Sequence, residues 1–135
     1  MSKEIKTVKC LSLFAGIGGF EVGMAPVGFR FTNTLEWDEN CCKTLNTNQQ
    51  FTGALEDDIK PIDIMLTAPE DFSSEEVDYI VGGPPCQSFS AAGRRAGGVA
   101  GTSDTRGTLF WYYCQYVKHF QPKAFVFENV RGILS

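Results

Sequence analysis

Short apolar runs recur along the chain, and each is followed by a turn or a polar cluster and then by a longer amphipathic stretch. Such runs are typical of strands buried in a sheet, whereas apolar residues spaced three or four apart indicate helices. We expect strands at residues 10–14, 29–35, 77–81 and 124–127, with a weaker strand within 51–59. Helices are expected at residues 20–25, 38–48 and 108–120, the second capped by Asp38, and loops at 61–74 and 87–107.

This alternation predicts an α/β fold with a mostly parallel, open, Rossmann-like sheet, because right-handed βα units build such sheets. The run at residues 124–127 is wholly apolar, as a parallel strand buried on both faces should be. Ligands of these sheets bind beyond the carboxyl ends of the strands. Glu36, Asp58, Cys86 and Glu128 all stand at predicted strand ends, so we expect the functional site there.

The length and charge of the chain limit the classes of protein to which it can belong. At 135 residues it fits one domain with a real core. No apolar run approaches the roughly 20 residues of a membrane helix, and no signal peptide follows Met1. We therefore expect no membrane partner and a location inside a cell. A net charge of −4 has the wrong sign for a free-standing nucleic-acid binder.

The cysteines do not suggest a metal site. There are 5 of them, without any C-x-x-C pair, and the single histidine, His119, is distant from them in sequence. We expect no metal and reduced thiols, most of them small buried hydrophobes.

A glycine cluster and two acids point to a nucleoside. Gly16, Gly18 and Gly19 follow the first strand, where glycine lets the backbone approach a ligand closely. Glu21 stands where a dinucleotide fingerprint has its third glycine, which disfavours a pyrophosphate. Each feature alone has an ordinary structural explanation. Together with Glu36 for ribose hydroxyls and Trp37 and Asp58 for an adenine, they favour adenosine.

Cys86 is the one thiol in a position that suits chemistry. It follows Pro84 and Pro85 at a strand end, and these prolines fix the backbone. A thiolate is a strong nucleophile, and nearby arginines, Arg106 among them, suit its activation. Glu128 ends the last predicted strand, where an apolar environment would desolvate its carboxyl group and suit a proton donor.

These residues resemble the DNA (cytosine-5)-methyltransferases over residues 10 to about 134. The pair Pro-Pro-Cys-Gln and Glu-Asn-Val is the most specific part of the resemblance. The segments that carry it are Phe14-Ala-Gly-Ile-Gly-Gly19, Glu36-Trp37, Asp58-Ile59, Gly83-Pro-Pro-Cys-Gln87, Asp104-Thr-Arg-Gly-Thr-Leu-Phe110 and Glu128-Asn-Val130.

The resemblance implies S-adenosylmethionine as cofactor, S-adenosylhomocysteine as product, and the methyltransferase version of the Rossmann-like fold. It places Phe14 against the adenine, the glycine turn near the amino-acid moiety and Glu36 on the ribose. The full set of implied cofactor residues is Phe14, Ala15, Gly16, Ile17, Gly18, Gly19, Glu36, Trp37, Asp58, Ile59, Pro84 and Leu109.

The same resemblance implies the chemistry. Cys86 would add to carbon 6 of a cytosine flipped out of duplex DNA, and Glu128 would bond the ring nitrogen, so that carbon 5 becomes nucleophilic. Asn129 and Arg106 are implied as further catalytic residues. The loop at residues 87–106 resembles one that closes over the flipped base. The setting of the family is DNA methylation, including restriction-modification.

Relative to this family, we expect residues 1–135 to be the N-terminal part of the catalytic domain. The sheet would be incomplete at its C-terminal side, and the target-recognition domain would be absent. A complementary C-terminal chain or region is then an expected partner. An S-adenosylmethionine-binding module that is inactive alone, or a transfer-RNA cytosine-5 methyltransferase, stays open as an alternative. Location would be cytoplasmic in a bacterium and nuclear in a eukaryote.

Overall fold

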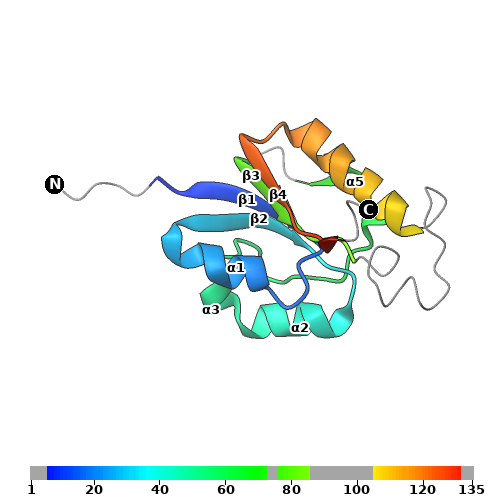
Figure 1. The fold of residues 1–135 in the computed structure, drawn as a ribbon. Coiled ribbons are helices and arrows are strands. Elements are labelled where there is room, and N and C mark those ends of the chain that lie inside the picture. The colour runs from blue at the N-terminus through cyan, green and yellow to red at the C-terminus, as the bar shows by residue number, and fades with distance from the viewer. Residues whose placement is uncertain (1–5, 73–75, 86–104, 132–135) are drawn as a thin grey trace.

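The protein is seen in a computed structural model that describes residues 6–72, 76–85 and 105–131, with the backbone alone for residues 105–108. Figure 1 shows the order of the elements along the chain. They are β1 (Val8–Leu13), α1 (Gly19–Met24), η1 (Ala25–Val27), β2 (Phe29–Leu35), α2 (Glu39–Thr47), α3 (Gln49–Thr52), η2 (Ile64–Leu66), η3 (Pro69–Asp71), β3 (Tyr79–Gly82), α5 (Thr105–Phe120) and β4 (Ala124–Phe127).

The described strands form one parallel sheet in the order β2-β1-β3-β4. The chain runs from β1 to β2 on one side and then crosses to β3 on the other side of β1. The order therefore reverses between β1 and β3, which is the point where doubly wound sheets bind ligands. The predicted α/β fold with an open parallel sheet is confirmed.

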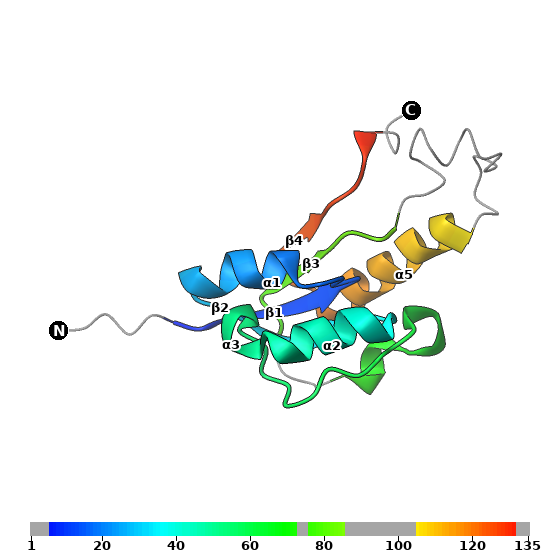
Figure 2. The same ribbon diagram turned by 90° about the horizontal axis from the view of Figure 1, so that it is seen from below.

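Alternating residues of β1 serve opposite faces of the sheet. Leu11 and Leu13 join Ile80, Tyr113 and Tyr116 in the larger core cluster, which α5 covers. Cys10 belongs to a second cluster, to which α1 contributes Phe20 and Met24. Helices α2 and α3 follow one another beside α1 (Figure 2). The sheet is thus covered by helices on both faces around β1.

The expected strand within residues 51–59 is wrong. The chain forms α3 there, Gly53 ends it with φ +65°, and Phe31 with Ala54 makes only an isolated bridge. The reason lies in Glu56, whose carboxylate accepts the Thr34 N–H at 2.8 Å and the Asn33 side-chain amide at 3.2 Å. A side chain therefore occupies this edge of β2 in place of another strand.

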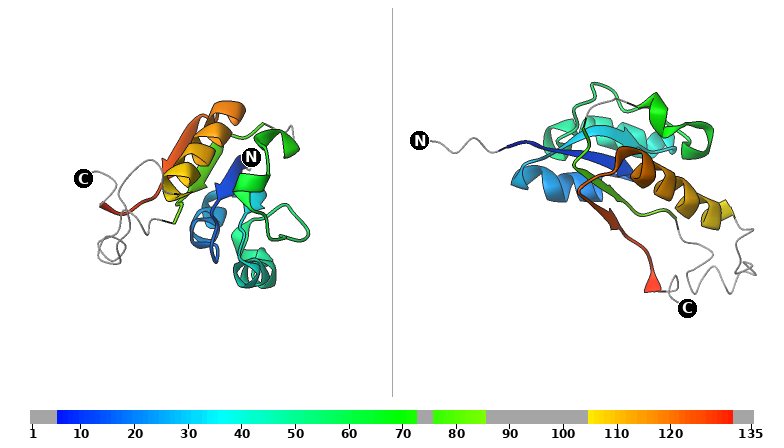
Figure 3. Two further views of the ribbon diagram at one scale, coloured as in Figure 1. Left: turned by 90° about the vertical axis from the view of Figure 1, so that its right-hand side faces the viewer. Right: turned by 90° about the horizontal axis from the view of Figure 1, so that it is seen from above.

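Strand β4 has the predicted bounds but not the predicted burial. Phe125 is 55% exposed and Val126 is 44% exposed, although neighbouring strand residues point to opposite faces. Because β4 is the outermost strand of the sheet and pairs only with β3, nothing described lies beyond it (Figure 3). The expectation that both of its faces are buried is wrong for the described residues.

Helix α1 brings a carboxylic acid into the interior. Glu21 is fully buried, and neither of its carboxyl oxygens has a hydrogen-bond partner among the described residues. The hydroxyls of Ser12 and Thr34, which are paired in register on β1 and β2, are buried without partners as well. Burial raises the pKa of Glu21 above its ordinary 4.5, because the interior penalises the charged carboxylate.

Glu21→Gln should remove a pH dependence of stability. The unfolded chain loses the Glu21 proton near pH 4.5, whereas the raised pKa lets the folded chain keep it. The free energy of unfolding should therefore fall as pH rises from 4.5 toward the folded pKa, by about 1.4 kcal/mol per pH unit. Urea unfolding of both proteins between about pH 5 and pH 7 measures this. Parallel curves for the two proteins would contradict the assignment.

Candidate functional site

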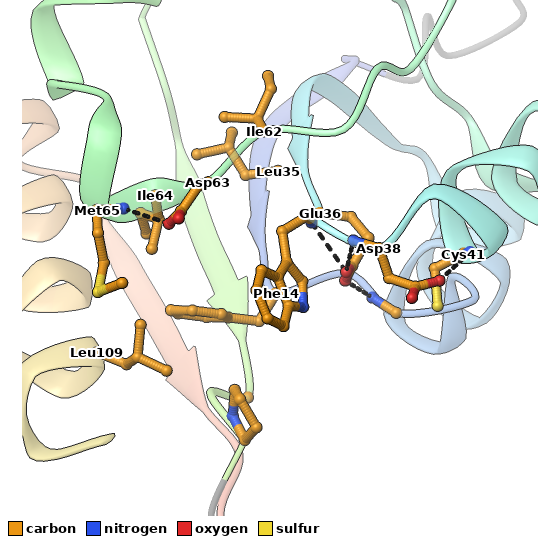
Figure 4. A pocket seen from close by; sticks show the side chains of 14 residues that line it. Phe14, Leu35, Glu36, Asp38, Cys41, Ile62, Asp63, Ile64, Met65 and Leu109 are labelled. Carbon is orange, nitrogen blue, oxygen red and sulfur yellow. Dashed lines mark hydrogen bonds between the residues drawn. The ribbon is translucent and has the colours of Figure 1, made fainter. Parts of the chain in front are cut away.

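A cavity of about 700 Å³ opens at the carboxyl ends of β1, β2 and β3. Its volume lies in the range of small-molecule sites. Figure 4 shows Phe14 and Glu36 between the end of β1 and the end of β2, with Met65 and Leu109 across from them. The lining residues are Phe14, Gly16, Leu35, Glu36, Trp37, Asp38, Cys41, Ile62, Asp63, Ile64, Met65, Gly83, Pro85 and Leu109.

The turn after β1 has a left-handed backbone at its key positions. Phe14 has φ +56° and Gly16 has φ +59°, and Gly18 follows with φ +94°. A Cβ on Gly18 would come within 2.8 Å of the Leu45 Cδ2 atom on α2. Gly18 therefore both permits the backbone conformation and lets the turn pack closely against α2.

The carboxylate of Glu36 holds the walls of the cavity together. One oxygen accepts the Gly16 N–H at 2.7 Å, and the other accepts the N–H groups of Trp37 at 2.9 Å and Asp38 at 2.8 Å. The backbone oxygen of Glu36 accepts the Ile62 N–H at 2.7 Å. One residue thus joins the glycine turn, the start of α2 and the segment before η2.

The cavity is acidic and otherwise largely apolar. Glu36, Asp38 and Asp63 line it, and among the described residues no Lys, Arg or His side chain lines it. The Cys41 N–H, which Asp38 accepts at 2.8 Å as the N-cap of α2, lowers the pKa of Asp38. Trp37 is 73% exposed beside these acids. The site suits a ligand with a positive charge, hydroxyl groups and a flat apolar part, and it disfavours a phosphate.

The structure brings together some of the predicted cofactor residues. Phe14, Gly16, Glu36, Trp37 and Leu109 line the cavity. The other predicted residues do not line it, although several lie in the same turns; these are Ala15, Ile17, Gly18, Gly19, Asp58, Ile59 and Pro84. Their roles stay predictions.

Asp58 and Ile59 do not line the cavity, and both are hydrogen-bonded to Asn46 of α2. The Asn46 side-chain amide donates to the Asp58 carboxylate at 3.0 Å and to the Ile59 backbone oxygen at 2.9 Å, and it accepts the Ile59 N–H at 2.8 Å. Ile59 is buried against α2, next to Cys42 and Leu45. No sequence motif predicts these hydrogen bonds of Asn46.

Several lining residues were missed by the sequence analysis. Ile62, Asp63, Ile64 and Met65 come from a segment predicted only as an irregular loop. The Ile62 N–H bond to Glu36 brings this segment to the cavity, and the Thr67 hydroxyl lies 3.3 Å from the Tyr116 hydroxyl on α5. No local pattern reveals these long-range contacts.

Glu128 lies next to the turn that precedes Cys86. A Cβ on Gly83 would come within 2.6 Å of the Glu128 Oε2 atom, and the Glu128 N–H donates to the Gly82 oxygen at 2.9 Å. Glu128 is nevertheless exposed, so the expected apolar surroundings of its carboxyl group are absent among the described residues. The Asn129 side chain accepts the neighbouring Val130 N–H at 2.7 Å. Cys86 and the side chain of Arg106 lie outside the described residues.

The interior thiols have no reactive character. Burial raises the pKa of Cys10 to about 12 and the pKa of Cys42 to about 11. Both therefore stay protonated near neutral pH. Among the residues that the structure describes, no group of three or more His, Cys, Asp or Glu side chains could hold a metal ion. No helix in this part of the chain is long and apolar enough to cross a membrane.

Comparison with known families decides the assignment. The family model for the C-5 cytosine-specific DNA methylases matches residues 8–135. The chain belongs to this family. The C-5 cytosine-specific DNA methylase fold and the predicted resemblance are thereby confirmed.

Individual members of the C-5 cytosine-specific DNA methylases are close in sequence over the same region. The Type II methyltransferase M.AquIA of Picosynechococcus sp. is 40% identical over 129 residues, which are 94% of this chain and 50% of that protein. M.NgoPII of Neisseria gonorrhoeae is 41% identical over 128 residues, 95% of this chain and 35% of that protein. The chain thus spans half or less of the length of these relatives.

Solved structures agree on the fold. A protein described as a DNA modification methyltransferase from an Escherichia coli prophage superposes with a TM-score of 0.73 at 28% identity, covering 96% of this chain and 34% of that one. The S. pombe Dnmt2 methyltransferase superposes with a TM-score of 0.68 at 20% identity, covering 95% of this chain and 36% of that one. At 20% identity, the similarity to the S. pombe Dnmt2 methyltransferase supports only a shared fold.

Glu36→Gln should destabilise the protein and loosen the cavity. The amide would present an N–H group to backbone donors that now share a carboxylate, at a cost of about 2 kcal/mol in the free energy of unfolding. Urea denaturation measures this loss. Glu39→Gln is the matched control, because Glu39 pairs only with Lys43 on the exposed side of α2 and should change little. Equal effects of the two substitutions would contradict the role of Glu36.

Proposed function

We propose that this chain is the N-terminal part of the catalytic domain of a methyltransferase that acts on carbon 5 of cytosine in DNA, with S-adenosylmethionine as methyl donor. The observation that supports the proposal is that two features of the site lie together at one edge of the sheet. That edge holds both the acidic cavity and Glu128, whose N–H donates to the Gly82 oxygen and whose side chain lies beside Gly83 in the turn that leads to Cys86. Membership of the family supports the reaction.

The cavity suits the proposed cofactor in size and charge. Three carboxylates, with no basic side chain beside them in the described part of the lining, favour a sulfonium and an ammonium group, and Trp37 and Phe14 offer flat apolar surfaces. Glu36 has donors on both oxygens and keeps limited acceptor capacity for ribose hydroxyls. When bound, the cofactor supplies an electrophilic methyl group.

The residues of this chain would prepare the cytosine. The Cys86 thiolate forms a bond from sulfur to carbon 6 and breaks the double bond between carbons 5 and 6. Glu128 donates its proton to the ring nitrogen opposite the sugar, so the displaced electron pair makes carbon 5 nucleophilic. Once carbon 5 carries the methyl group, it would lose its proton to water, and the electron pair left behind would re-form the double bond to carbon 6 as the sulfur leaves as a thiolate. The ring nitrogen would then return its proton to the Glu128 carboxylate. The adjacency of Glu128 to Gly83 supports this pairing of acid and thiol.

Binding of DNA requires positive charge that this chain lacks. Its net charge of −4 opposes contact with phosphates, so the positive charge should come from a further C-terminal region or chain. We infer that the chain alone has little activity. Relatives that are named Type II methyltransferases and come from bacteria favour a role in restriction-modification in a bacterial cytoplasm.

S-adenosylhomocysteine should bind to the chain and change the fluorescence of Trp37, whereas ATP should not. Trp37 is 73% exposed at the cavity, and the surrounding carboxylates repel phosphates. Fluorescence titration of the wild type and of Trp37→Phe measures this, with Trp111→Phe as the matched control. Tighter binding of ATP than of S-adenosylhomocysteine would refute the proposed cofactor.

Cys86→Ser should abolish methyl transfer and leave cofactor binding intact. The assay uses a chimera in which residues 8–135 replace the matched segment of M.NgoPII, with tritiated methyl incorporation into duplex DNA as readout. The expected loss is about three orders of magnitude or more, because the hydroxyl is a far weaker nucleophile. Cys114→Ser is the control. A serine variant with full activity would defeat the assignment, and methylation of transfer RNA in place of DNA would redirect the substrate.

Gly83→Ala should lower the activity of the same chimera without unfolding it. The added Cβ would lie 2.6 Å from the Glu128 Oε2 atom and 3.2 Å from its backbone oxygen, so Glu128 must move. The matched control is Gly23→Ala, since a Cβ at Gly23 meets no atom within 4 Å. A Gly83→Ala variant with unchanged turnover would show that the position of Glu128 does not matter.

A further inference from the structure

A buried carboxyl group lies directly behind the glycine turn of the cavity. Glu21 belongs to the first turn of α1, whose N-cap is Gly18. A Cβ on Gly18 would lie 3.8 Å from the Glu21 Oε2 atom, and the Glu21 side chain is fully buried. Gly16 in the same turn lines the cavity, and its N–H donates to Glu36. Two carboxyl groups, one in the interior and one at the cavity, therefore flank this turn.

Two hydroxyl groups of the sheet face the same space beneath α1. Ser12 and Thr34 are paired in register on β1 and β2. Leu13 and Leu35, which follow them, belong to the cluster under α5, so both hydroxyls point to the opposite face, where α1 lies. Both are buried without a hydrogen-bond partner among the described residues, as are the two carboxyl oxygens of Glu21. Such clusters are rare in native proteins and often have a functional reason.

These surroundings tolerate a neutral Glu21 better than a charged one. The groups that shift the pKa of Glu21 include no cation among the described residues. Its titratable neighbours are Cys10 on β1, which stays a neutral thiol because burial raises its pKa to about 12, and Glu36 at the end of β2. Burial, and then the like charge of Glu36, raise the pKa of Glu21. The side chains that α2, α3 and β3 bring to this region do not titrate; they are Leu45, Thr52 and Val81.

We propose that Glu21 is a positioning residue of the cofactor cavity, which supports the glycine turn only while its carboxyl group is protonated. In that form the first turn of α1 packs against the sheet. When the proton passes to water, the unpaired carboxylate must be hydrated, so this turn of α1 has to move outward. The Val22 N–H donates to the Gly18 oxygen at 2.9 Å, so the movement also displaces Gly18. This inference rests on the proposed function, because it concerns binding of the S-adenosyl cofactor.

The affinity for the cofactor should therefore fall as pH rises. The closed turn keeps the Glu21 proton because burial raises its pKa, whereas an opened turn exposes a carboxyl group that ionises near its ordinary 4.5. Above pH 4.5 the opened state gains population as pH rises toward the raised pKa, and it binds the cofactor less well. Above the raised pKa the effect levels off, because both states have then lost the proton.

Calorimetric titration of the chain with S-adenosylhomocysteine between about pH 5 and pH 8 tests this coupling. S-adenosylhomocysteine has no sulfonium charge, so direct attraction to the Glu21 carboxylate is small. The ratio of the dissociation constant of the wild type to that of Glu21→Gln should rise by at least about threefold over this range. All other titrating groups are common to the two proteins, so the ratio isolates Glu21. Glu39→Gln is the matched control and should keep the wild-type profile, since Glu39 pairs with Lys43 on the exposed side of α2.

A second measurement needs no substitution. Carbon-13 NMR of the Glu21 side-chain carboxyl follows its titration in the wild type, with and without saturating S-adenosylhomocysteine. Linkage is reciprocal, so a ligand that prefers the protonated form must raise the midpoint of this titration. A Glu21 with a merely structural role would titrate at the same pH in both samples.

Two results would overturn this inference alone: binding of S-adenosylhomocysteine with a ratio that does not change with pH, or a Glu21 midpoint that the ligand leaves unchanged or lowers. Circular dichroism checks that Glu21→Gln folds, and if it does not, the NMR titration of the wild type decides. Failure of S-adenosylhomocysteine to bind the wild type and both variants at every pH would instead refute the proposed cofactor, and this inference with it.

Discussion

The carboxylate of Glu36 is the interaction on which the site depends. Its three backbone hydrogen bonds fix the turn after β1 and the start of α2, and its own backbone oxygen holds the segment that leads into η2. Charged acceptors make stronger hydrogen bonds than neutral ones, and Glu36 is only 8% exposed. The cavity is therefore shaped by a side chain that also faces its interior.

This arrangement links folding to ligand binding. A ligand hydroxyl that approaches Glu36 must share the carboxylate with backbone donors, so it meets an acceptor that is already oriented. Phe14 and Gly16, with their left-handed backbone, belong to the same turn. Among the described residues, the lining carries the carboxylates of Glu36, Asp38 and Asp63 and no basic side chain, which favours a ligand with positive charge. Glu36, at the end of β2, thus contributes both to the shape of the cavity and to its negative charge.

Local patterns predicted most of the fold because each element has a local cause. The bounds of β2 and β4 agree with the apolar runs, and Asp38 caps α2 as expected. The failures come from long-range contacts. Glu56 occupies the position beside β2 where a strand was expected, and β4 is the outermost described strand, so its apolar side chains are exposed. Ile62 and Met65 line the cavity because the Ile62 N–H donates to the Glu36 backbone oxygen, and no sequence motif predicts this contact.

Amide chemical shifts of the chain titrated with S-adenosylmethionine test the central claim most directly. The account predicts the largest changes at Gly16, Trp37 and Asp38, whose N–H groups bind Glu36. A separate hollow is lined by Val22, Arg30 and Phe51, and changes centred there would contradict the account, as would the absence of any change.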